Sequence, residues 1–439
     1  MPYPQPCTIG SHFMEERPRH EFAPQPKGLQ MKLTAALHQA TYPLSILRQR
    51  NFGLVWLSTS LAAMGSQMET LVLGWYVLNL TDSPFLVGLV GAARLGLNFL
   101  ALFAGAIADR VSRQSLLTAV EYVMAALGLI MLGLILSGAL EVWHIFALTL
   151  VGGVVRMFQT PSAQSLVADT LAPERIANGA ALTTMGRNLA TIVGPLAGGV
   201  LFEASGAEGA YFAIVLLYVL SGSAALLVRA SRTASSKDRG SVLGSTLQGL
   251  KYVKGEQVLW ATLLVAVIAN LTGWPLHTNL MPIFARDVLD TGAAGLGMLI
   301  SAFGVGALAG SMVLAWVRNL RYAGRLLLVA IVLWHASMVA FAASTSIPLS
   351  LGILVFTGAA FSATQVLMLT VLLRTAPPDY RGRVMGLRVL AIYGHALGSV
   401  SSGAVAGAWG APWAAQINAV VGVALVGALA LVAPKLRRA

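Results

Sequence analysis

The sequence has little charge and almost no cysteine. Asp, Glu, Lys and Arg make up 10% of its 439 residues, against about 25% in ordinary globular chains. So few charges cannot cover the surface of a water-soluble protein, which indicates largely lipid surroundings. Because Cys7 is the only cysteine, disulfides, redox pairs and thiolate metal clusters are excluded. The sequence also lacks a glycine loop followed by Lys and Ser or Thr, which argues against an ATP-driven pump, and we expect no cofactor or metal.

Apolar residues are abundant instead. They make up 56% of the chain, and its 45 glycines are typical of closely packed membrane helices. A bilayer core about 30 Å thick needs about 20 apolar residues per helix. We therefore predict an all-α membrane protein with twelve transmembrane helices in two six-helix bundles. The spans lie near 52–79, 85–107, 115–137, 143–165, 178–203, 209–229, 257–282, 293–317, 326–344, 347–373, 384–408 and 411–434.

These spans divide the chain into four parts. Residues 1–50 contain prolines and mixed charges but no apolar core of the signal-peptide type, which indicates a disordered cytoplasmic tail. Residues 51–229 form the N-terminal six-helix bundle and residues 257–439 the C-terminal one. Residues 230–256 form a basic, polar cytoplasmic linker, in which 241–254 predict an amphipathic helix on the membrane surface.

Basic residues predict the orientation of the spans. Of the 29 Lys and Arg residues, 24 fall on one side, in the tail, the linker, the carboxyl end and the loops between them. The opposite side has only Arg286. Because Lys and Arg mark the cytoplasmic side, both termini are predicted to be cytoplasmic. The net charge of +12 does not indicate nucleic-acid binding, because the basic residues are spread over seven segments rather than clustered in one fold.

The two halves repeat each other at an offset of 204 residues. Ala172-Pro173 matches Ala376-Pro377, and Gly194 matches Gly398. Six spans separate the copies, so both have the same orientation in the membrane and form a parallel repeat. Chance alignment of glycine-rich helices is the alternative, but the matches keep one offset through helix, loop and helix.

A charged loop between the second and third spans reads GAIADRVSRQ, residues 105–114. It resembles the signature G-x-L-A-D-R-x-G-R-K of the major facilitator superfamily, with Ser112 replacing a glycine. The resemblance implies that Asp109 docks at the amino terminus of a helix of the other half and holds a cytoplasmic gate shut. Alternatively, the loop arginines only anchor the loop inside. The candidate gate residues are Gly105, Asp109, Arg110, Arg113, Arg381 and Arg383.

Other segments resemble one branch of the major facilitator superfamily in particular. Three segments resemble those of the enterobactin-exporter branch, which includes macrolide-efflux carriers. They are NFGLVWL from Asn51, GPLAGG in the fifth span and APPDYRGRVMGL before the eleventh span. The resemblance implies an exporter of the bacterial cytoplasmic membrane, and the fifth span also resembles the family's antiporter motif. Pro195 cannot donate an N–H and the glycines thin the helix, which predicts bending at Gly194, Pro195, Gly198 and Gly199.

Arg94, Arg156 and Arg187 lie deep within predicted spans. One such arginine costs about 2.5–3.5 kcal/mol on insertion scales, so each needs a reason to be there. Either Arg156 and Arg187 pair with Glu121 and helix carbonyls, or at least one arginine faces a central cavity and contacts substrate. Arg388, in contrast, is predicted to reach the membrane surface. The candidate cavity residues are Arg94, Asn98, Arg156, Gln159, Arg187, Asn270 and Trp274.

Proton coupling usually relies on a titratable group within the membrane. The candidates are Glu69, Glu121 and His395. Together these features predict a monomeric carrier in the lipid bilayer that exports a small, siderophore-like or drug-like molecule by alternating access, with protons as coupling ions. The excess of deep arginines favours acidic substrates. An uptake permease is the first alternative, and a scaffold or enzyme the second, although no metal-spaced or nucleophile–base cluster is present.

Overall fold

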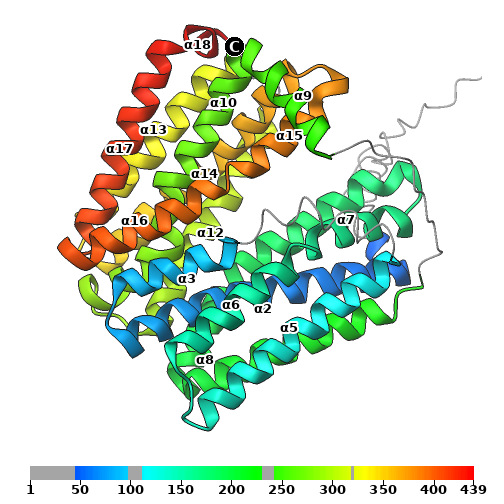
Figure 1. Cartoon of the computed structure of the whole chain (residues 1–439), viewed down its shortest axis with the longest axis vertical. Helices are drawn as coiled ribbons and strands as arrows, with labels where there is room; N and C mark the ends of the chain where they lie inside the picture. The colour runs from blue at the N-terminus through cyan, green and yellow to red at the C-terminus, as the bar shows by residue number, and fades with distance from the viewer. Residues whose placement is uncertain (1–44, 97–110, 230–241, 318–320) are drawn as a thin grey trace, which may run out of the picture. The chain divides into compact units, whose positions relative to one another are not determined.

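The structure is a computed structural model that describes residues 45–96, 111–229, 242–317 and 321–439 (Figure 1). Every regular element within these ranges is a helix. Several predictions fall outside them: most of the tail, the first part of the linker, and the candidate residues Asn98, Gly105, Asp109 and Arg110.

The N-terminal half contains one long helix, α8, against which α2, α5 and α7 pack. The elements are α2 (Arg50–Thr81), α3 (Pro84–Gly96), α5 (Arg113–Leu136), α6 (Val142–Arg156), α7 (Gln159–Thr170), η3 (Pro173–Arg175) and α8 (Ile176–Leu226). The backbone of α8 is non-helical at Ser205 and Gly206, where Gly206 adopts φ 68°. This break coincides with the predicted loop between the fifth and sixth spans. On either side of it, α8 packs against α2 and α5.

One predicted span is interrupted. Residues 143–165 were expected to form a single helix, but α6 ends at Arg156 and α7 begins at Gln159. Pro161 gives the physical reason, because it has no N–H to donate to the carbonyl of Met157 four residues earlier. The side chains on the two sides of this break therefore point in directions that a continuous helix would not allow.

The C-terminal half begins with the predicted linker helix α9 (Val242–Gly255), whose Tyr252 stacks on Tyr380 at 4.1 Å between ring centroids. The next helix alternates α-helical and wide π-helical turns. Its segments are α10 (Gln257–Ile268), η4 (Ala269–Gly273), η5 (Leu276–Leu280), α11 (Met281–Ile283) and η6 (Phe284–Val288). Pro275 and Pro282 follow two of the wide turns, and because they lack an N–H they cannot continue the i→i+5 hydrogen bonding.

The remaining helices complete the C-terminal half. They are α12 (Ala293–Trp316), α13 (Ala323–Ala342), α14 (Ile347–Thr375), α15 (Pro378–Leu390), α16 (Tyr393–Trp409), α17 (Ala411–Val432) and α18 (Pro434–Arg438). Helices α12 and α14 approach closely through glycine: a Cβ on Gly306 would strike the backbone of Val355, and one on Gly358 the carbonyl of Phe303. Small residues at such contacts are typical of membrane helices.

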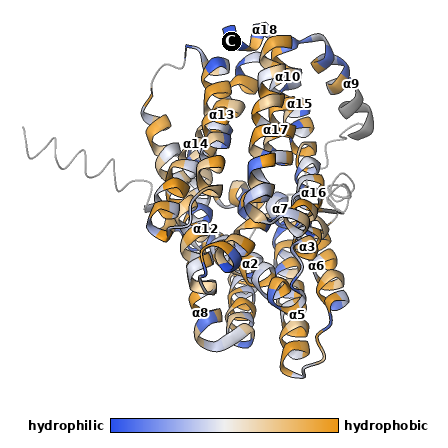
Figure 2. Ribbon diagram, turned by 90° about the vertical axis from the view of Figure 1, so that its left-hand side faces the viewer, coloured by the Kyte–Doolittle hydropathy of each residue, from blue (hydrophilic) through white to orange (hydrophobic). Residues whose placement is uncertain are grey.

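Nine helical stretches of the described residues are long and apolar enough to cross a membrane. One of them, Pro173–Leu226, is counted once although it contains the break at Ser205 and Gly206. Hydrophobic residues run along α5 and α17, while hydrophilic ones gather near α9 and α18 (Figure 2). Large apolar side chains such as Leu129 and Trp143 are exposed, as expected for a lipid-facing surface. The number twelve and the orientation of the termini stay predictions.

Candidate functional site

A pocket shared by both halves is lined by Arg94, one of the three deep arginines of the sequence analysis. This shared pocket, about 220 Å³, is lined by Ser66, Gln67, Thr70, Leu73, Gly74, Val87, Val90, Gly91, Arg94 and Leu95 of the N-terminal half and by Thr278, Asn279 and His395 of the C-terminal half. Arg94 donates to the backbone oxygen of Ser66 at 3.2 Å and to its Oγ at 3.0 Å. Gly91 lets α3 approach Asn279, whose Nδ2 is buried without a described partner. Arg94 is thus held by neutral groups, and no ion pair within the described residues neutralises it.

In the N-terminal half, a buried ion pair ties three helices together. Arg156 of α6 pairs with Glu69 of α2. The Oη of Tyr218, on α8, accepts from Arg156 at 2.7 Å and donates to Glu69 at 3.0 Å. The exposed fractions of the Arg156 and Glu69 side chains are only 14% and 16%, so each charge depends on the other. The alternative prediction that Arg156 pairs with Glu121 is therefore wrong.

Glu121 has a different partner because of the break after α6. Its Oε1 accepts from Gln159 Nε2 at 2.8 Å, from the first residue of α7. The side chain is fully buried, and its Oε2 has no partner among the described residues. A buried carboxyl group with one oxygen unbonded is costly as an anion, which makes Glu121 a physically reasonable place to hold a proton.

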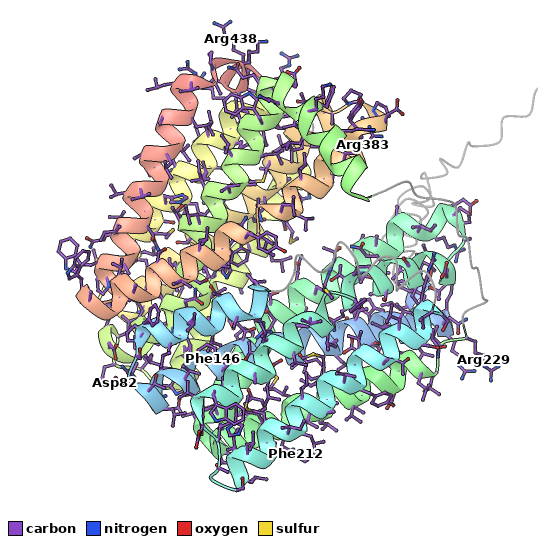
Figure 3. The ribbon with its side chains drawn as sticks, in the orientation of Figure 1. Asp82, Phe146, Phe212, Arg229, Arg383 and Arg438 are labelled. Atoms are coloured by element: carbon purple, nitrogen blue, oxygen red, sulfur yellow. The ribbon has the colours of Figure 1, made fainter. Side chains whose placement is uncertain are left out.

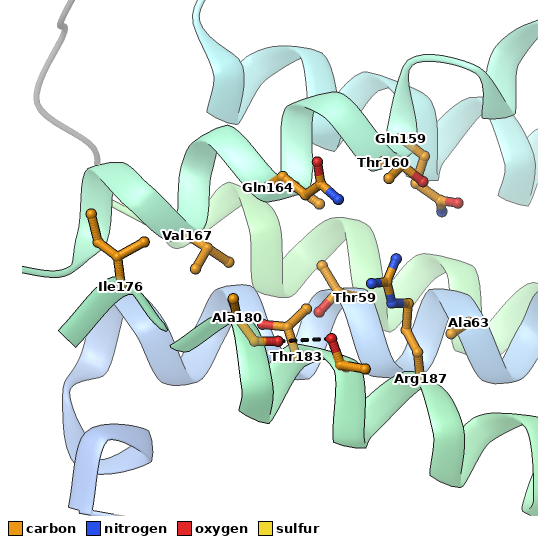
Figure 4. A pocket seen from close by; sticks show the side chains of 12 residues that line it. Thr59, Ala63, Gln159, Thr160, Gln164, Val167, Ile176, Ala180, Thr183 and Arg187 are labelled. Carbon is orange, nitrogen blue, oxygen red and sulfur yellow. Dashed lines mark hydrogen bonds between the residues drawn. The ribbon is translucent and has the colours of Figure 1, made fainter. Parts of the chain in front are cut away.

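Gln159 also faces a second pocket, within the N-terminal half (Figure 4). This bundle pocket, about 290 Å³, is lined by Thr59, Ala63, Gln159, Thr160, Ala163, Gln164, Val167, Ile176, Ala180, Thr183, Thr184 and Arg187. The Arg187 side chain lies in its wall, opposite Gln159 and Thr160 (Figure 4). The prediction that Arg187 pairs with Glu121 is wrong, because Arg187 lines this pocket and no described hydrogen bond or ion pair joins it to Glu121, whose bonded partner is Gln159. The bundle pocket is lined by one cation, several neutral polar groups and no carboxylate.

The third pocket joins the predicted residues of the C-terminal half. This aromatic pocket, about 410 Å³, is lined by Leu95, Ala266, Asn270, Trp274, Thr278, Gln365, Met368, Met385, Arg388, Val389, Ile392 and His395. Asn270, Trp274 and His395 were predicted to be functional, and the structure brings them together. Arg388 was predicted to reach the membrane surface and was not a candidate cavity residue. In the structure it lines this pocket from the last turn of α15.

The described gate candidates have partners within their own half. Nη1 of Arg113 donates to both carboxylate oxygens of Asp169, at 2.7 and 2.9 Å. Arg381 donates to the carbonyl of Ala376 at 3.3 Å, and the Arg383 guanidinium lies 4.9 Å from the Tyr380 ring. The gate candidate Arg383, in the C-terminal half, lies far from Asp82, and so does Arg229 at the end of the N-terminal half (Figure 3). The docking predicted for Asp109 falls outside the described residues.

The glycines of the antiporter-like motif serve close packing. A Cβ on Gly194 or Gly198 would crowd α2, and one on Gly199 would strike the carbonyl of Ala293 at the start of α12. The backbone keeps helical torsions through Pro195 and departs from them only at Ser205 and Gly206, and bending at this motif stays a prediction. In this structure the segment is packed tightly between α2 and α12.

Contacts between the halves are the feature that the sequence prediction missed. Arg286, at the end of η6, pairs with Asp82 at 2.6 Å and donates to the carbonyl of Leu78 at 3.0 Å. Glu203 accepts from the N–H of Ala294 at 2.9 Å, at the amino terminus of α12. These contacts share the end of the helices that carries Asp82, opposite to the end where Asn51 bonds Arg229. The isolation of Arg286 on its side of the membrane was the available signal.

Helices α3 and α16 extend this contact. A Cβ on Gly88 would strike the carbonyl of Ser399, and Gly403 faces the backbone of α3. On the other flank, Ser301 of α12 donates to the carbonyl of Ile192 of α8 at 2.6 Å. The two halves therefore meet through backbone-to-backbone packing that small residues permit.

The sequence was compared with known families and proteins. The family described as transmembrane secretion effector, a group of the major facilitator superfamily, has a model that matches residues 41–439. The chain belongs to this family. It is 25% identical over 393 residues to the multidrug efflux pump Tap of Mycolicibacterium fortuitum, covering 86% of this chain and 94% of Tap. This major facilitator protein is accordingly a multi-pass membrane transporter of small molecules and not an enzyme.

Solved structures show the same fold for this major facilitator protein. A bacterial homolog of the human lysosomal transporter Spinster, inward-facing and occupied, superposes with a TM-score of 0.70 at 16% identity, covering 89% of this chain and 97% of that one. The POT family transporter PepTSo gives 0.72 at 12% identity, covering 88% and 98%. At these identities the likeness establishes the fold alone. The enterobactin-exporter branch stays a prediction.

Proposed function

We propose that the protein exports a small organic anion from the bacterial cytoplasm by alternating access, in exchange for protons. One observation carries the substrate class. The titratable residues that line the three pockets are Arg94, Arg187, Arg388 and His395, and no carboxylate lines any of them. A cavity with this lining favours a negatively charged solute and disfavours a cationic one, because unpaired like charges are costly away from water.

Alternating access accounts for the contacts between the halves. With twelve spans and cytoplasmic termini, the end that carries Asp82 and Arg286 faces outward, so this structure is closed outside. Opening would break the polar contacts and glycine packings described above, together with part of the apolar packing that joins the two halves. Interfaces of this kind are typical of parts that move as rigid bodies.

Proton coupling fits the network of the N-terminal half. Gln159 joins the buried carboxyl group of Glu121 to the bundle pocket. Glu69 is held by Arg156 and Tyr218, so gain of a proton there would leave a buried arginine without its counter-charge. His395 lines both the shared and the aromatic pockets. We infer that Glu121 exchanges protons, that the Glu69 pair holds the helices together, and that His395 serves the substrate.

Export rather than uptake rests on the relative named as an efflux pump and on the resemblance to exporters. A siderophore-like acid or an acidic drug-like molecule would both meet the electrostatic requirement.

Inverted membrane vesicles that contain the full chain provide the test. With an imposed pH gradient, acid inside, we expect labelled carboxylates to accumulate more than their neutral amides or the matching amines. Arg94→Gln should reduce carboxylate accumulation at least tenfold, whereas Arg325→Gln, an exposed cation of α13, should not. Accumulation is counted as the excess over vesicles without the protein, because an acid interior traps amines by protonation alone. A preference for the amines in this excess, or an excess that a protonophore leaves intact, would contradict the proposal. Accumulation that requires the opposite gradient would indicate uptake.

A further inference from the structure

The aromatic pocket has a chemical character that the electrostatic argument does not use. Trp274 lines it and meets three neighbouring rings edge-on: Phe361 at 5.0 Å and 69°, and His277 and His395 at 6.2 Å and 85° and 88°. No ring among the described residues lies parallel to Trp274. The surrounding rings fix the orientation of the indole, and a planar group could still stack on it.

Flexible and polar groups complete this pocket. Met368 and Met385 supply thioethers, which adapt to the edges of aromatic rings. Arg388 lines the same space and makes no ion pair with a described carboxylate. His395 is only 7% exposed, yet its Nδ1 has no hydrogen-bond partner within the described residues. A buried ring nitrogen without a partner is costly unless a ligand satisfies it.

The break between α15 and α16 brings these groups together. Helix α15 ends at Leu390 and α16 begins at Tyr393, with Ala391 and Ile392 between them. Arg388 and His395 lie on opposite sides of the break and line one pocket. The cation and the unpaired nitrogen therefore share a space with the Trp274 indole.

We propose that this pocket is a subsite for an aromatic ring that carries an acidic oxygen substituent. The ring stacks on Trp274 between the methionines, and the carboxylate or phenolate accepts from Arg388, with His395 as a further hydrogen-bond partner. A guanidinium and a planar carboxylate match in geometry as well as in charge. This subsite rests on the proposed transport of an organic anion and narrows its class to aromatic acids.

Binding to the purified full chain in nanodiscs tests separately whether the subsite recognises the aromatic ring and whether it recognises the acidic group. The probes are benzoate, benzamide and cyclohexanecarboxylate, which differ in charge or in aromaticity. We expect benzoate to bind at least tenfold more tightly than either. Arg388→Gln should abolish the preference for benzoate over benzamide but keep that over cyclohexanecarboxylate, and Trp274→Leu should do the reverse.

Matched variants control for general damage. Arg325→Gln and Trp413→Leu change an exposed cation and an indole that is 59% exposed in the same half, and should leave both preferences unchanged. Trp274→Phe keeps an aromatic surface and should retain most of the preference that Trp274→Leu loses.

The result that overturns the subsite is equal binding of benzoate and cyclohexanecarboxylate, or a charge preference that Arg187→Gln removes and Arg388→Gln does not. In either case, proton-driven transport of aliphatic carboxylates would leave the proposed function standing. Absence of transport for every carboxylate would instead refute the proposed function.

Discussion

The contact between Arg286 and Asp82 allows a quantitative prediction about the outer gate that we propose at this end of the helices. Arg286 is 25% exposed and Asp82 85%, so their ion pair contributes at the low end of surface pairs, about 0.5 kcal/mol. The hydrogen bond from Arg286 to the carbonyl of Leu78 adds about 1.5 kcal/mol, as expected for a charged donor. The bond to Asp287 is local and persists in both states. Arg286→Gln should therefore destabilise the closed state by about 2 kcal/mol, which is about 30-fold in its equilibrium with the open state.

A cysteine introduced at position 399 reports this equilibrium. Ser399 is fully buried where α16 meets Gly88 of α3, and its hydroxyl has no described partner, so Ser399→Cys disturbs little. Because Cys7 is the only natural cysteine, Cys7→Ser provides a clean background. A membrane-impermeant maleimide added from outside would label the introduced thiol only when the halves separate there, and the labelling rate would measure the open fraction.

We expect Arg286→Gln to raise the labelling rate about 30-fold and Asp82→Asn only about twofold, since the latter removes just the exposed pair. Arg325→Gln should have no effect. A rate within twofold of the parent in Arg286→Gln would refute the assignment of Arg286 to the outer gate.

Three further predictions follow from the packing and the pockets. Glu69→Gln should leave Arg156 buried without a counter-charge and cost about 3–5 kcal/mol, seen as a lower midpoint of thermal unfolding; an unchanged midpoint would mean that water reaches the pair. Gly306→Leu should separate α12 from α14 and sharply reduce the yield of folded protein, whereas Gly352→Ala, which has open space around it, should not; equal yields would contradict the close approach. Arg187→Gln should weaken carboxylate transport without altering thermal stability, because its side chain lies in a pocket wall, and unchanged transport would remove the bundle pocket from the substrate path.

The composition was enough to predict the features that depend on the lipid surroundings of the chain. Lipid surroundings require helices, so apolar runs were enough to locate most of them, and α13 and α17 agree closely with the predicted spans. The cost of burying a guanidinium was enough to single out Arg94 as a candidate cavity residue, and Arg94 lines the shared pocket, while its role stays a prediction.

The side-chain pairs between helices could not be predicted, because they depend on how each helix is rotated about its own axis. Pro161 ends the continuity of α6 and α7, and this local effect sends Arg156 to Glu69 and Gln159 to Glu121. The proline is visible in the sequence and was the signal for the break. Arg388 gave no comparable signal, since its place beside the aromatic pocket follows from a break at Ala391 and Ile392 that contains neither proline nor glycine.

The wide turns after α10 place one column of side chains along the aromatic pocket. Ala266, Asn270, Trp274 and Thr278 all line it, at intervals of four residues. In an ordinary α-helix each such step advances about 40° beyond a full turn, so the successive steps would wind the column around towards lipid. The extra residue held in each wide turn offsets that drift. Deleting one residue from η4 would disperse the column around the helix while leaving its composition almost intact.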